Sequence, residues 1–499
     1  MIGFTLLTRL PLLTYPKACD DEQVYVVVAV EMLHGGRPYA DGVERKPPAL
    51  FYLYQLILGL FGERNYLALH IAALAWTLAT MALLYRIMRR IGGVGTGWVA
   101  AALYAVFSAW ANFTDLAFNG ELLMNLPVVA AFAIALRPSS SRFRLDLFVA
   151  GGLVSVAFLL KQPSVIAGLP LAIYLLHPDY RGRRGLTWAH ALAQAALLFL
   201  GFAATLGGAA LYLDHIGILR EAWYWSVGNH VNPLGPTTWF FWRKLPARGA
   251  LFVLECLPLL LATAISVRDG AARRGVWSAH RAEFAAFVVF LIVSWIGVNA
   301  NGQFNYHYFI QLMPPLALLA APVFAEIWQG TRVARARYLT PLFLARWIGL
   351  TALVFLVVDT IGLAQYRGPL QAAVYVREHS TENDRIFMWG QGTAQTGLYL
   401  DAHRRPATRY IASFPLNGMI FGLRDPNYDT RDRIVPGSWE NLRADFERHP
   451  PKFIIDCHEL RDGALHRIRD YPYLKSLLDS QFHEVFRAPD GIVYERRAS

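Results

Sequence analysis

The chain has 499 residues, of which 55% are hydrophobic, 13% aromatic and only 17% charged, and its mean hydropathy is +0.32. A chain of this length with so little charge is too apolar for a soluble globular protein and is typical of a protein that crosses a membrane many times. The formal net charge of +11 does not indicate nucleic-acid binding, because the arginines gather in short loops between apolar segments.

The chain begins with a short apolar stretch, residues 2–14, which contains Arg9 and Pro11. A helix of this length spans about 20 Å, whereas the hydrocarbon core of a bilayer is roughly 30 Å thick. No small-residue cleavage site precedes Lys17, so the stretch does not fit a signal peptide. We interpret it as the outer half of a first transmembrane helix. We expect the natural translation product to carry roughly ten to twenty further apolar residues before Met1.

Residues 19–62 contain the first long charged loop of the chain, between two helical patterns. This stretch opens with three consecutive acids before a helical pattern and continues through a charged loop to Lys46, Pro47 and Pro48. Proline is suited to the first turn of a helix, and Gly62 follows the last apolar residues of the next pattern. The sequence therefore predicts a helix, a charged loop and a second helix, with carboxylates at the entrance and a lysine at the exit.

Further apolar segments lie near 66–86, 93–112, 121–136, 146–160, 163–177, 189–212, 248–267, 282–299, 309–327 and 342–363. They predict a polytopic α-helical membrane protein with about 11 transmembrane helices, the first of them truncated. Alternate loops carry arginines, and the positive-inside rule assigns these loops to the cytoplasm. They are marked by Arg89, Arg142, Arg183, Arg273 and Arg335.

The opposite parity assigns to the outer side of the membrane residues 15–65, 113–120, 161–162, 213–247, 300–308 and everything after 364. All six lysines fall on that side: Lys17, Lys46, Lys161, Lys244, Lys452 and Lys475. Six residues can share one side by chance in an arginine-rich protein. The functional interpretation is that compact ammonium groups were kept where a phosphate is bound, with Lys46 and Lys161 as the candidates.

Residues 365–499 change in character, because helical patterns at 369–380, 439–450 and 471–480 alternate with short strand patterns. The strands are expected at 385–390, 452–457, 483–488 and 491–496. We therefore divide the chain into a transmembrane domain, 1–364, with its first outer loop at 15–65, and an extracytoplasmic α/β domain, 365–499. No glycine-rich phosphate loop follows a strand, so a nucleotide site in that domain is not expected.

The conspicuous polar groups of the transmembrane part lie at predicted outer helix ends, and each has a structural alternative. The acids Asp21 and Glu22, and likewise Glu121, can simply cap helices. Lys161 can extend its ammonium group to the membrane surface, and residues 305–308 can belong to an aromatic belt.

Glu255 differs from these groups, because it lies about two turns inside the predicted helix 248–267. A carboxylate at the bilayer centre costs roughly 2.5–3.5 kcal/mol on insertion scales. We therefore expect Glu255 to face a cavity or a partner.

Four short motifs follow one another in the first outer loop: Asp21-Glu22-x-x-Tyr25, Gly36-Arg37-Pro38-Tyr39, Lys46-Pro47-Pro48 and Leu60-Phe61-Gly62. In this order they resemble the first outer loop of glycosyltransferase family 39, which has the GT-C fold and includes protein O-mannosyltransferases and the bacterial lipid A aminoarabinose transferase. The resemblance continues through Asn119-Gly120-Glu121, Lys161, His307-Tyr308 and Met313-Pro314-Pro315, and in the tail through Asp384-Arg385-Ile386-Phe387 and Arg404-Arg405-Pro406-Ala407. His70 and Gln303 stand where many relatives carry arginine, so the phosphate contacts of those relatives do not carry over there.

The resemblance implies an inverting glycosyltransferase that moves one sugar from a polyprenyl-phosphate donor to an acceptor outside the cytoplasm. It also implies a multi-pass protein of the plasma membrane, which is the inner membrane in bacteria. Asp21 is then the catalytic base for the acceptor, with Glu22 and Glu121 as further acids. Lys46 and Lys161 bind the donor phosphate, and the matching aromatic positions Tyr25, His307 and Tyr308 belong to the substrate site.

The acceptor is a lipid A or other glycan, a lipid or a protein, and the sequence does not choose among them. No cofactor is required by the sequence, and a divalent metal stays an open question. The three cysteines predict no disulfide framework and no metal site, although a bridge between Cys19 and Cys457 stays open.

Two other functions remain as alternatives: a flippase or transporter of a lipid-linked sugar, and a catalytically inactive relative that acts in binding or assembly. A transporter is expected to carry internal repeats and ionisable residues near the bilayer midplane, where only Glu255 is found.

Overall fold

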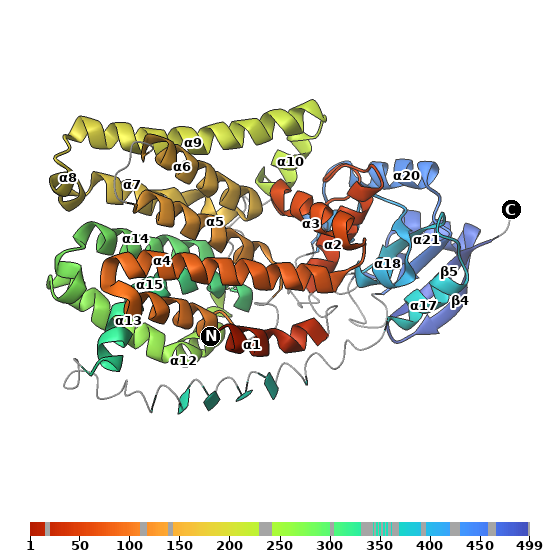
Figure 1. The fold of residues 1–499 in the computed structure, drawn as a ribbon. Coiled ribbons are helices and arrows are strands. Elements are labelled where there is room, and N and C mark those ends of the chain that lie inside the picture. The colour runs from red at the N-terminus through yellow and green to blue at the C-terminus, as the bar shows by residue number, and fades with distance from the viewer. Residues whose placement is uncertain are drawn as a thin grey trace.

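The structure is a computed structural model. It describes residues 1–14, 20–109, 117–137, 143–228, 242–299, 304–330, 369–390, 396–419, 430–457 and 466–497, together with scattered positions between 343 and 361. A helical body contains the N-terminal two thirds of the chain, and a mixed α/β domain formed by the C-terminal residues lies at one end of it (Figure 1). The helix α2 and the loop that follows it lie where the two parts meet (Figure 1).

The described helices of the body are α1 (Ile2–Thr14), α2 (Asp20–Leu33), α3 (Pro48–Phe61), α4 (Tyr66–Phe107), α5 (Gly120–Ala135), α6 (Phe143–Leu160), η2 (Gln162–Ala167), α7 (Gly168–Leu176), α8 (Pro178–Arg184), α9 (Trp188–His215), α10 (Leu219–Ser226), α12 (Leu245–Glu255), α13 (Leu257–Ala271), η4 (Gly275–Ser278), α14 (Arg281–Asn299), η5 (Tyr306–Leu312) and α15 (Met313–Trp328). The expected helix, charged loop and helix at the start of the chain are present as α2, the loop and α3. Pro48 occupies the first turn of α3, and Gly62 ends the helix with a φ of 111°.

Four helical stretches among the described residues are long and apolar enough to cross a membrane: α4, α9, α14 and the continuous stretch Tyr306–Trp328. A fifth is possible if α12 and α13, which are bent by 82° at their junction, count as one span. Shorter apolar helices are α1, α3, α5 and the stretch Gln162–Leu176. The expected count of about 11 therefore differs from what length and composition support in this part of the chain, and the expected segment 342–363 lies largely outside the described residues.

Element α4 contains the expected segment 66–86 and the described part of 93–112 as two helices that meet at a kink. The helical backbone is interrupted at Gly93, whose φ of 86° is in the left-handed region that glycine adopts without strain. The turn between the two segments is thus a local break in the helix, for which the sequence shows only Gly92-Gly93.

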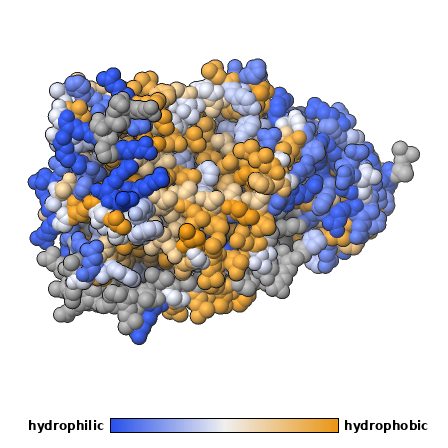
Figure 2. All heavy atoms as spheres, viewed as in Figure 1, coloured by the Kyte–Doolittle hydropathy of each residue, from blue (hydrophilic) through white to orange (hydrophobic). Residues whose placement is uncertain are grey.

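The surface of the helical body is a broad hydrophobic band between two hydrophilic ends, one of which is the C-terminal domain (Figure 2). Large apolar side chains of α9 contribute to this exposed surface, including Phe199 (67% exposed) and Leu211 (74% exposed). An apolar band of this kind is what a bilayer covers, so a membrane surrounds the helical body.

The C-terminal domain is built on a five-stranded sheet with the order β2-β1-β3-β5-β4. Its strands are β1 (Arg385–Trp389), β2 (Arg405–Pro406), β3 (Phe453–Asp456), β4 (Phe482–Ala488) and β5 (Gly491–Arg496). Strand β1 pairs in parallel with β2 and β3, whereas β5 pairs antiparallel with β3 and β4. The four expected strands correspond to β1, β3, β4 and β5, and only the two-residue β2 lacks a pattern in the sequence.

The helices of this domain are α17 (Gln371–Glu378), α18 (Gly397–Ala402), α19 (Phe414–Asn417), η7 (Arg431–Arg433), α20 (Ser438–Arg448), η8 (Ile468–Asp470) and α21 (Pro472–Gln481). The three expected helices correspond to α17, α20 and α21. The short α18 is the helix that contacts α2, so it links the domain to the helical body.

Candidate active site

Asp21 and Glu22 are neighbours in the first turn of α2 and point in different directions, because successive residues of a helix are about 100° apart. The Tyr25 hydroxyl, one turn further along, donates a hydrogen bond to Oδ2 of Asp21 over 3.3 Å. The Lys46 Nζ atom lies 3.6 Å from the same oxygen. Asp21 and Lys46, the acid at the entrance and the lysine at the exit of the loop, thus form an ion pair.

Glu22 faces the interior of the helical body and is completely buried. Its Oε2 atom lies 2.7 Å from Nε2 of His70 in α4, and its Oε1 atom accepts a hydrogen bond from the Phe118 backbone N–H over 2.5 Å. The other ring nitrogen of His70 lies 3.2 Å from the carbonyl oxygen of Leu12 in α1. Glu22 therefore links α2 to α1, α4 and the segment before α5, and it does not join Asp21 in the ion pair.

A second ion pair lies deeper in the body. Glu121, in the first turn of α5, is 2.5 Å from Nζ of Lys161, which directly follows α6. The Nε2 atom of His307 in η5 lies 3.7 Å from the same Glu121 oxygen. The ring of Tyr308 faces Lys161, with Nζ 5.2 Å from the ring centroid.

These two ion pairs belong to one electrostatic site. Burial alone would raise the pKa of the Asp21 carboxyl, but the electrostatic effects of Lys46, His307 and Lys161 outweigh it and hold that pKa below its ordinary value. Burial would likewise lower the pKa of Lys46, but the carboxylates Asp21 and Glu121 raise it above its ordinary value. At neutral pH Asp21 is therefore an anion and Lys46 a cation.

The two pairs differ in their access to solvent. We call Asp21 and Lys46 the accessible pair, because their side chains are 31% and 17% exposed. Glu121 and Lys161 are the buried pair, with side chains 3% and 9% exposed. Solvent therefore reaches the accessible pair more easily than the buried pair.

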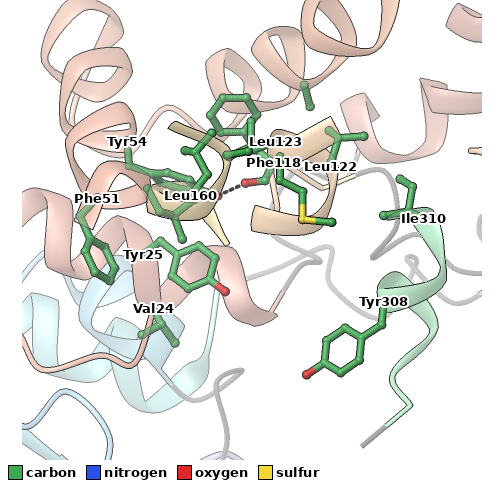
Figure 3. Close-up of a cluster of buried hydrophobic side chains, with 14 of the residues drawn as sticks. Val24, Tyr25, Phe51, Tyr54, Phe118, Leu122, Leu123, Leu160, Tyr308 and Ile310 are labelled. Atoms are coloured by element: carbon green, nitrogen blue, oxygen red, sulfur yellow. Dashed lines mark hydrogen bonds between the residues drawn. The ribbon is translucent and has the colours of Figure 1, made fainter. Parts of the chain in front are cut away.

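Aromatic rings surround the accessible pair. Tyr25 from α2 and Tyr308 from η5 approach from opposite sides with their hydroxyl groups directed into the space between them (Figure 3). Tyr25 packs edge-on against Tyr54, whose hydroxyl donates a hydrogen bond to the carbonyl oxygen of Phe118 over 2.9 Å. Lys46 Nζ lies 5.7 Å from the centre of the Tyr25 ring.

The backbone next to Lys46 is held by two residues that the sequence did not single out by role. The Tyr39 hydroxyl donates to the carbonyl oxygen of Lys46 over 2.7 Å, and Tyr39 itself has a positive φ of 68°, which is uncommon for a residue with a side chain. Gln162 donates from Nε2 to the carbonyl oxygens of Arg45 and Ser226, both over 2.9 Å. In the sequence, Tyr39 stands out only as part of the motif Gly36-Arg37-Pro38-Tyr39, and Gln162 only as the neighbour of Lys161.

The structure thus brings together all but one of the site residues expected from the sequence. These are Asp21, Tyr25, Lys46, Glu121, Lys161, His307 and Tyr308, and Glu22 is the residue that lies elsewhere. Glu255 is the last residue of α12, at the bend before α13, where it is half-buried. Cys19 and Gln303 lie outside the described residues, as does any bridge between Cys19 and Cys457. Among the residues that the structure describes, no group of three or more His, Cys, Asp or Glu side chains is placed to hold a metal ion.

A family model described as dolichyl-phosphate-mannose-protein mannosyltransferase matches residues 45–206, a range that includes Lys46, Glu121 and Lys161. No curated protein sequence matches the chain significantly.

The solved structures that share its fold include the following three, each at 13% sequence identity. ArnT from Cupriavidus metallidurans bound to undecaprenyl phosphate has a TM-score of 0.57 over 99% of this chain and 98% of its own. The apo state of the same protein has a TM-score of 0.59 over 97% and 95%. The archaeal oligosaccharyltransferase AglB from Archaeoglobus fulgidus, in complex with an inhibitory peptide and a dolichol-phosphate, has a TM-score of 0.52 over 99% of this chain and 74% of its own. The chain therefore has the GT-C glycosyltransferase fold that its motifs led us to expect.

Proposed function

We propose that this protein is an inverting glycosyltransferase that transfers a single sugar from a polyprenyl-phosphate donor to a glycan, lipid or protein acceptor on the extracytoplasmic side of the plasma membrane. The observation that carries the proposal is the pairing of Asp21 with Lys46 beside the buried Glu121–Lys161 pair. A substrate can therefore contact one carboxylate, Asp21, and one ammonium group, Lys46, and the buried pair lies next to them. The phosphate-linked lipids bound by ArnT and AglB are consistent with such a donor.

Lys46 is proposed to bind the donor phosphate, with Lys161 behind it. A charge-assisted contact of this kind contributes about 1.5–3 kcal/mol. When the phosphate forms an ion pair with Lys46, Asp21 loses the cation that holds its pKa low. Donor binding therefore makes the Asp21 carboxylate more basic at the moment when a base is needed.

The acceptor hydroxyl or amine then gives its proton to Asp21 and forms a bond to the anomeric carbon of the sugar. The bond between that carbon and the phosphate oxygen breaks on the opposite side, and the phosphate leaves with the electron pair. Lys46 and Lys161 stabilise the charge that develops on the phosphate. Attack on the face opposite the leaving group inverts the configuration of the sugar.

The test compares Asp21→Asn with Lys46→Ala in the full-length protein. Asp21→Asn keeps the shape but removes the base, so turnover is expected to fall about 10²-fold or more while binding of undecaprenyl phosphate stays within a few-fold. Lys46→Ala is expected to weaken that binding and to slow turnover as well. Asp479→Asn, the same change at an exposed ion pair of α21, serves as the control and should be silent.

Mass spectrometry of envelope glycolipids and glycoproteins from a deletion strain, complemented with each variant, measures the transfer in cells. An envelope that does not change on deletion would contradict the proposal. Near-normal transfer by Asp21→Asn would reduce Asp21 to a helix cap, because asparagine caps a helix about as well as aspartate.

A further inference from the structure

The C-terminal domain contacts α2 at the end opposite Asp21. Glu31 is only 4% exposed and receives two parallel hydrogen bonds from Arg405 in β2, from Nε to Oε1 and from Nη2 to Oε2, each 2.7 Å long. Arg385 in β1 approaches Oε2 to 3.5 Å. The two arginines are aligned partners on adjacent parallel strands, so the sheet itself fixes their spacing. We call Glu31, Arg385 and Arg405 the Glu31 cluster.

The same domain also contacts the loop segment that precedes Lys46. The backbone N–H of Val43 donates to the carbonyl oxygen of Arg409 over 2.8 Å. The Arg409 side chain is in turn held by Asp445 through two bonds of 3.0 and 2.8 Å. Arg45 lies over the ring of Phe414, 4.7 Å from its centre.

A further contact lies close to Asp21. Gly397, the first residue of α18, packs against the side chain of Gln23, and a Cβ atom at position 397 would lie 2.1 Å from Oε1 of Gln23. The domain therefore touches the first turn of α2 directly at this position. The domain thus contacts α2 near both of its ends and the loop three residues before Lys46.

We propose that the C-terminal domain positions the two accessible charges for sugar transfer, and that Glu31 and Arg405 are positioning residues for Asp21. Helix α2 is a rigid rod, in which Asp21 and Glu31 are ten residues and therefore about 15 Å apart. Holding its far end sets the position of its near end, and a displacement of about 1 Å at reacting groups can cost roughly 10²-fold in rate. This inference rests on the proposed roles of Asp21 and Lys46.

The first measurement needs no substrate. Hydrogen exchange of the full-length protein in detergent compares wild type with Glu31→Gln, which keeps the size of the side chain but removes its charge. We expect the amides of residues 24–27 and 43–46 to exchange at least about ten-fold faster, because the buried charge-assisted pair that holds α2 is lost. The control is Glu484→Gln, which breaks a similar two-bond pair with Arg487 on the exposed surface of the same domain. It should leave both segments unchanged.

The second measurement is sugar transfer by the same variants. Glu31→Gln is expected to lower turnover about ten-fold or more, and also to weaken binding of undecaprenyl phosphate, because Lys46 lies in the loosened segment 43–46. Faster exchange confined to β1 and β2, with 24–27 and 43–46 unchanged, would overturn the inference, because the cluster would then only attach the domain. Normal turnover despite a loosened α2 would overturn it as well. Since the exchange result does not depend on activity, a failure of the proposed role of Asp21 would show separately, as normal transfer by Asp21→Asn.

Discussion

Neighbouring acids in α2 have different surroundings, and these surroundings suggest different roles. Asp21 is partly exposed beside Lys46, whereas Glu22 is buried against His70. A carbonyl oxygen only accepts hydrogen bonds, so the His70 Nδ1 that faces Leu12 must carry a proton. The contact between His70 Nε2 and Glu22 Oε2 is a buried hydrogen bond of 2.7 Å. Glu22 is thus placed to hold helices together: in the described part of the chain its carboxylate contacts His70 and Phe118 and belongs to neither ion pair.

Substitutions of Glu22 separate a structural role from a catalytic one. Glu22→Gln can still accept from Phe118 and can donate to His70, so we expect transfer within a few-fold of wild type and little change in melting temperature. Glu22→Ala leaves both partners unsatisfied in the interior and should destabilise the protein by about 3–5 kcal/mol. Thermal unfolding in detergent and the transfer assay measure the two effects. A large loss of turnover by Glu22→Gln at an unchanged melting temperature would indicate that Glu22 has a catalytic role.

Gln162 has a side chain that links the two lysines of the site. It directly follows Lys161, and its amide nitrogen donates to the carbonyl oxygen of Arg45, next to Lys46. Gln162→Glu replaces the donor with a carboxylate that faces two carbonyl oxygens. We expect binding of undecaprenyl phosphate to weaken about ten-fold, because both ammonium groups lose their fixed separation. Gln371→Glu, the same change at the exposed start of α17, is the control and should bind normally.

At the scale of elements, close helix contacts depend on individual glycines. Helices α6 and α9 approach so closely that a Cβ at Gly201 would lie 1.8 Å from the carbonyl oxygen of Phe148. A Cβ at Gly151 would lie 1.8 Å from the carbonyl oxygen of Leu198. Small residues allow backbones to approach in this way in membrane proteins. The pair α6 and α9 supports the site indirectly, because Lys161 directly follows the last residue of α6.

Gly201→Ala should separate α6 from α9 and destabilise the protein, at a typical overpacking cost of about 1–3 kcal/mol. Gly207→Ala is the matched control in the same helix, because no atom lies within 4 Å of the added Cβ. Alanine is also the better helix former, by roughly 1 kcal/mol, so Gly207→Ala should be neutral or slightly stabilising. Melting temperatures of the purified variants in one detergent test the difference. Equal effects of the two substitutions would contradict the close contact.

At the scale of the whole molecule, the arrangement of charge predicts the orientation in the membrane. The hydrophobic band separates the C-terminal domain from an opposite hydrophilic end (Figure 2). The positive-inside rule assigns the arginine loops to the cytoplasm and the C-terminal domain to the outside. The site at the junction of body and domain would then face the extracytoplasmic side, where a lipid-linked donor can enter from the bilayer.

Cysteine labelling in spheroplasts tests this orientation, in a background without Cys19, Cys256 and Cys457. The membrane-impermeant maleimide should label Ser480→Cys in α21 but not Ser278→Cys in η4, since both positions are exposed at the protein surface and only their side of the membrane differs. Permeabilised cells should show label at both positions. Label at position 278 alone in intact spheroplasts would reverse the orientation.

The sequence by itself determined the class of protein, the first outer loop and most elements of the C-terminal domain. Hydropathy, turn-forming residues and strand alternation are local properties, so α2, α3, β1, β3, β4 and β5 were predictable from short windows. The sequence also showed the charged residues of the candidate site at the ends of predicted helices. The motif resemblance suggested that these residues belong to one site.

Only the tertiary structure decided which of these charges meet. Asp21 and Lys46 lie 25 positions apart, Glu121 and Lys161 lie 40 apart, and Glu31 and Arg405 lie 374 apart in the chain. The same holds for the separation of Asp21 from Glu22, which the sequence assigned to one catalytic group. The direction of a side chain depends on how its helix is rotated against its neighbours. That rotation follows from packing between distant segments, such as the contacts of α2 with α4 and with the C-terminal domain, and no local pattern encodes it.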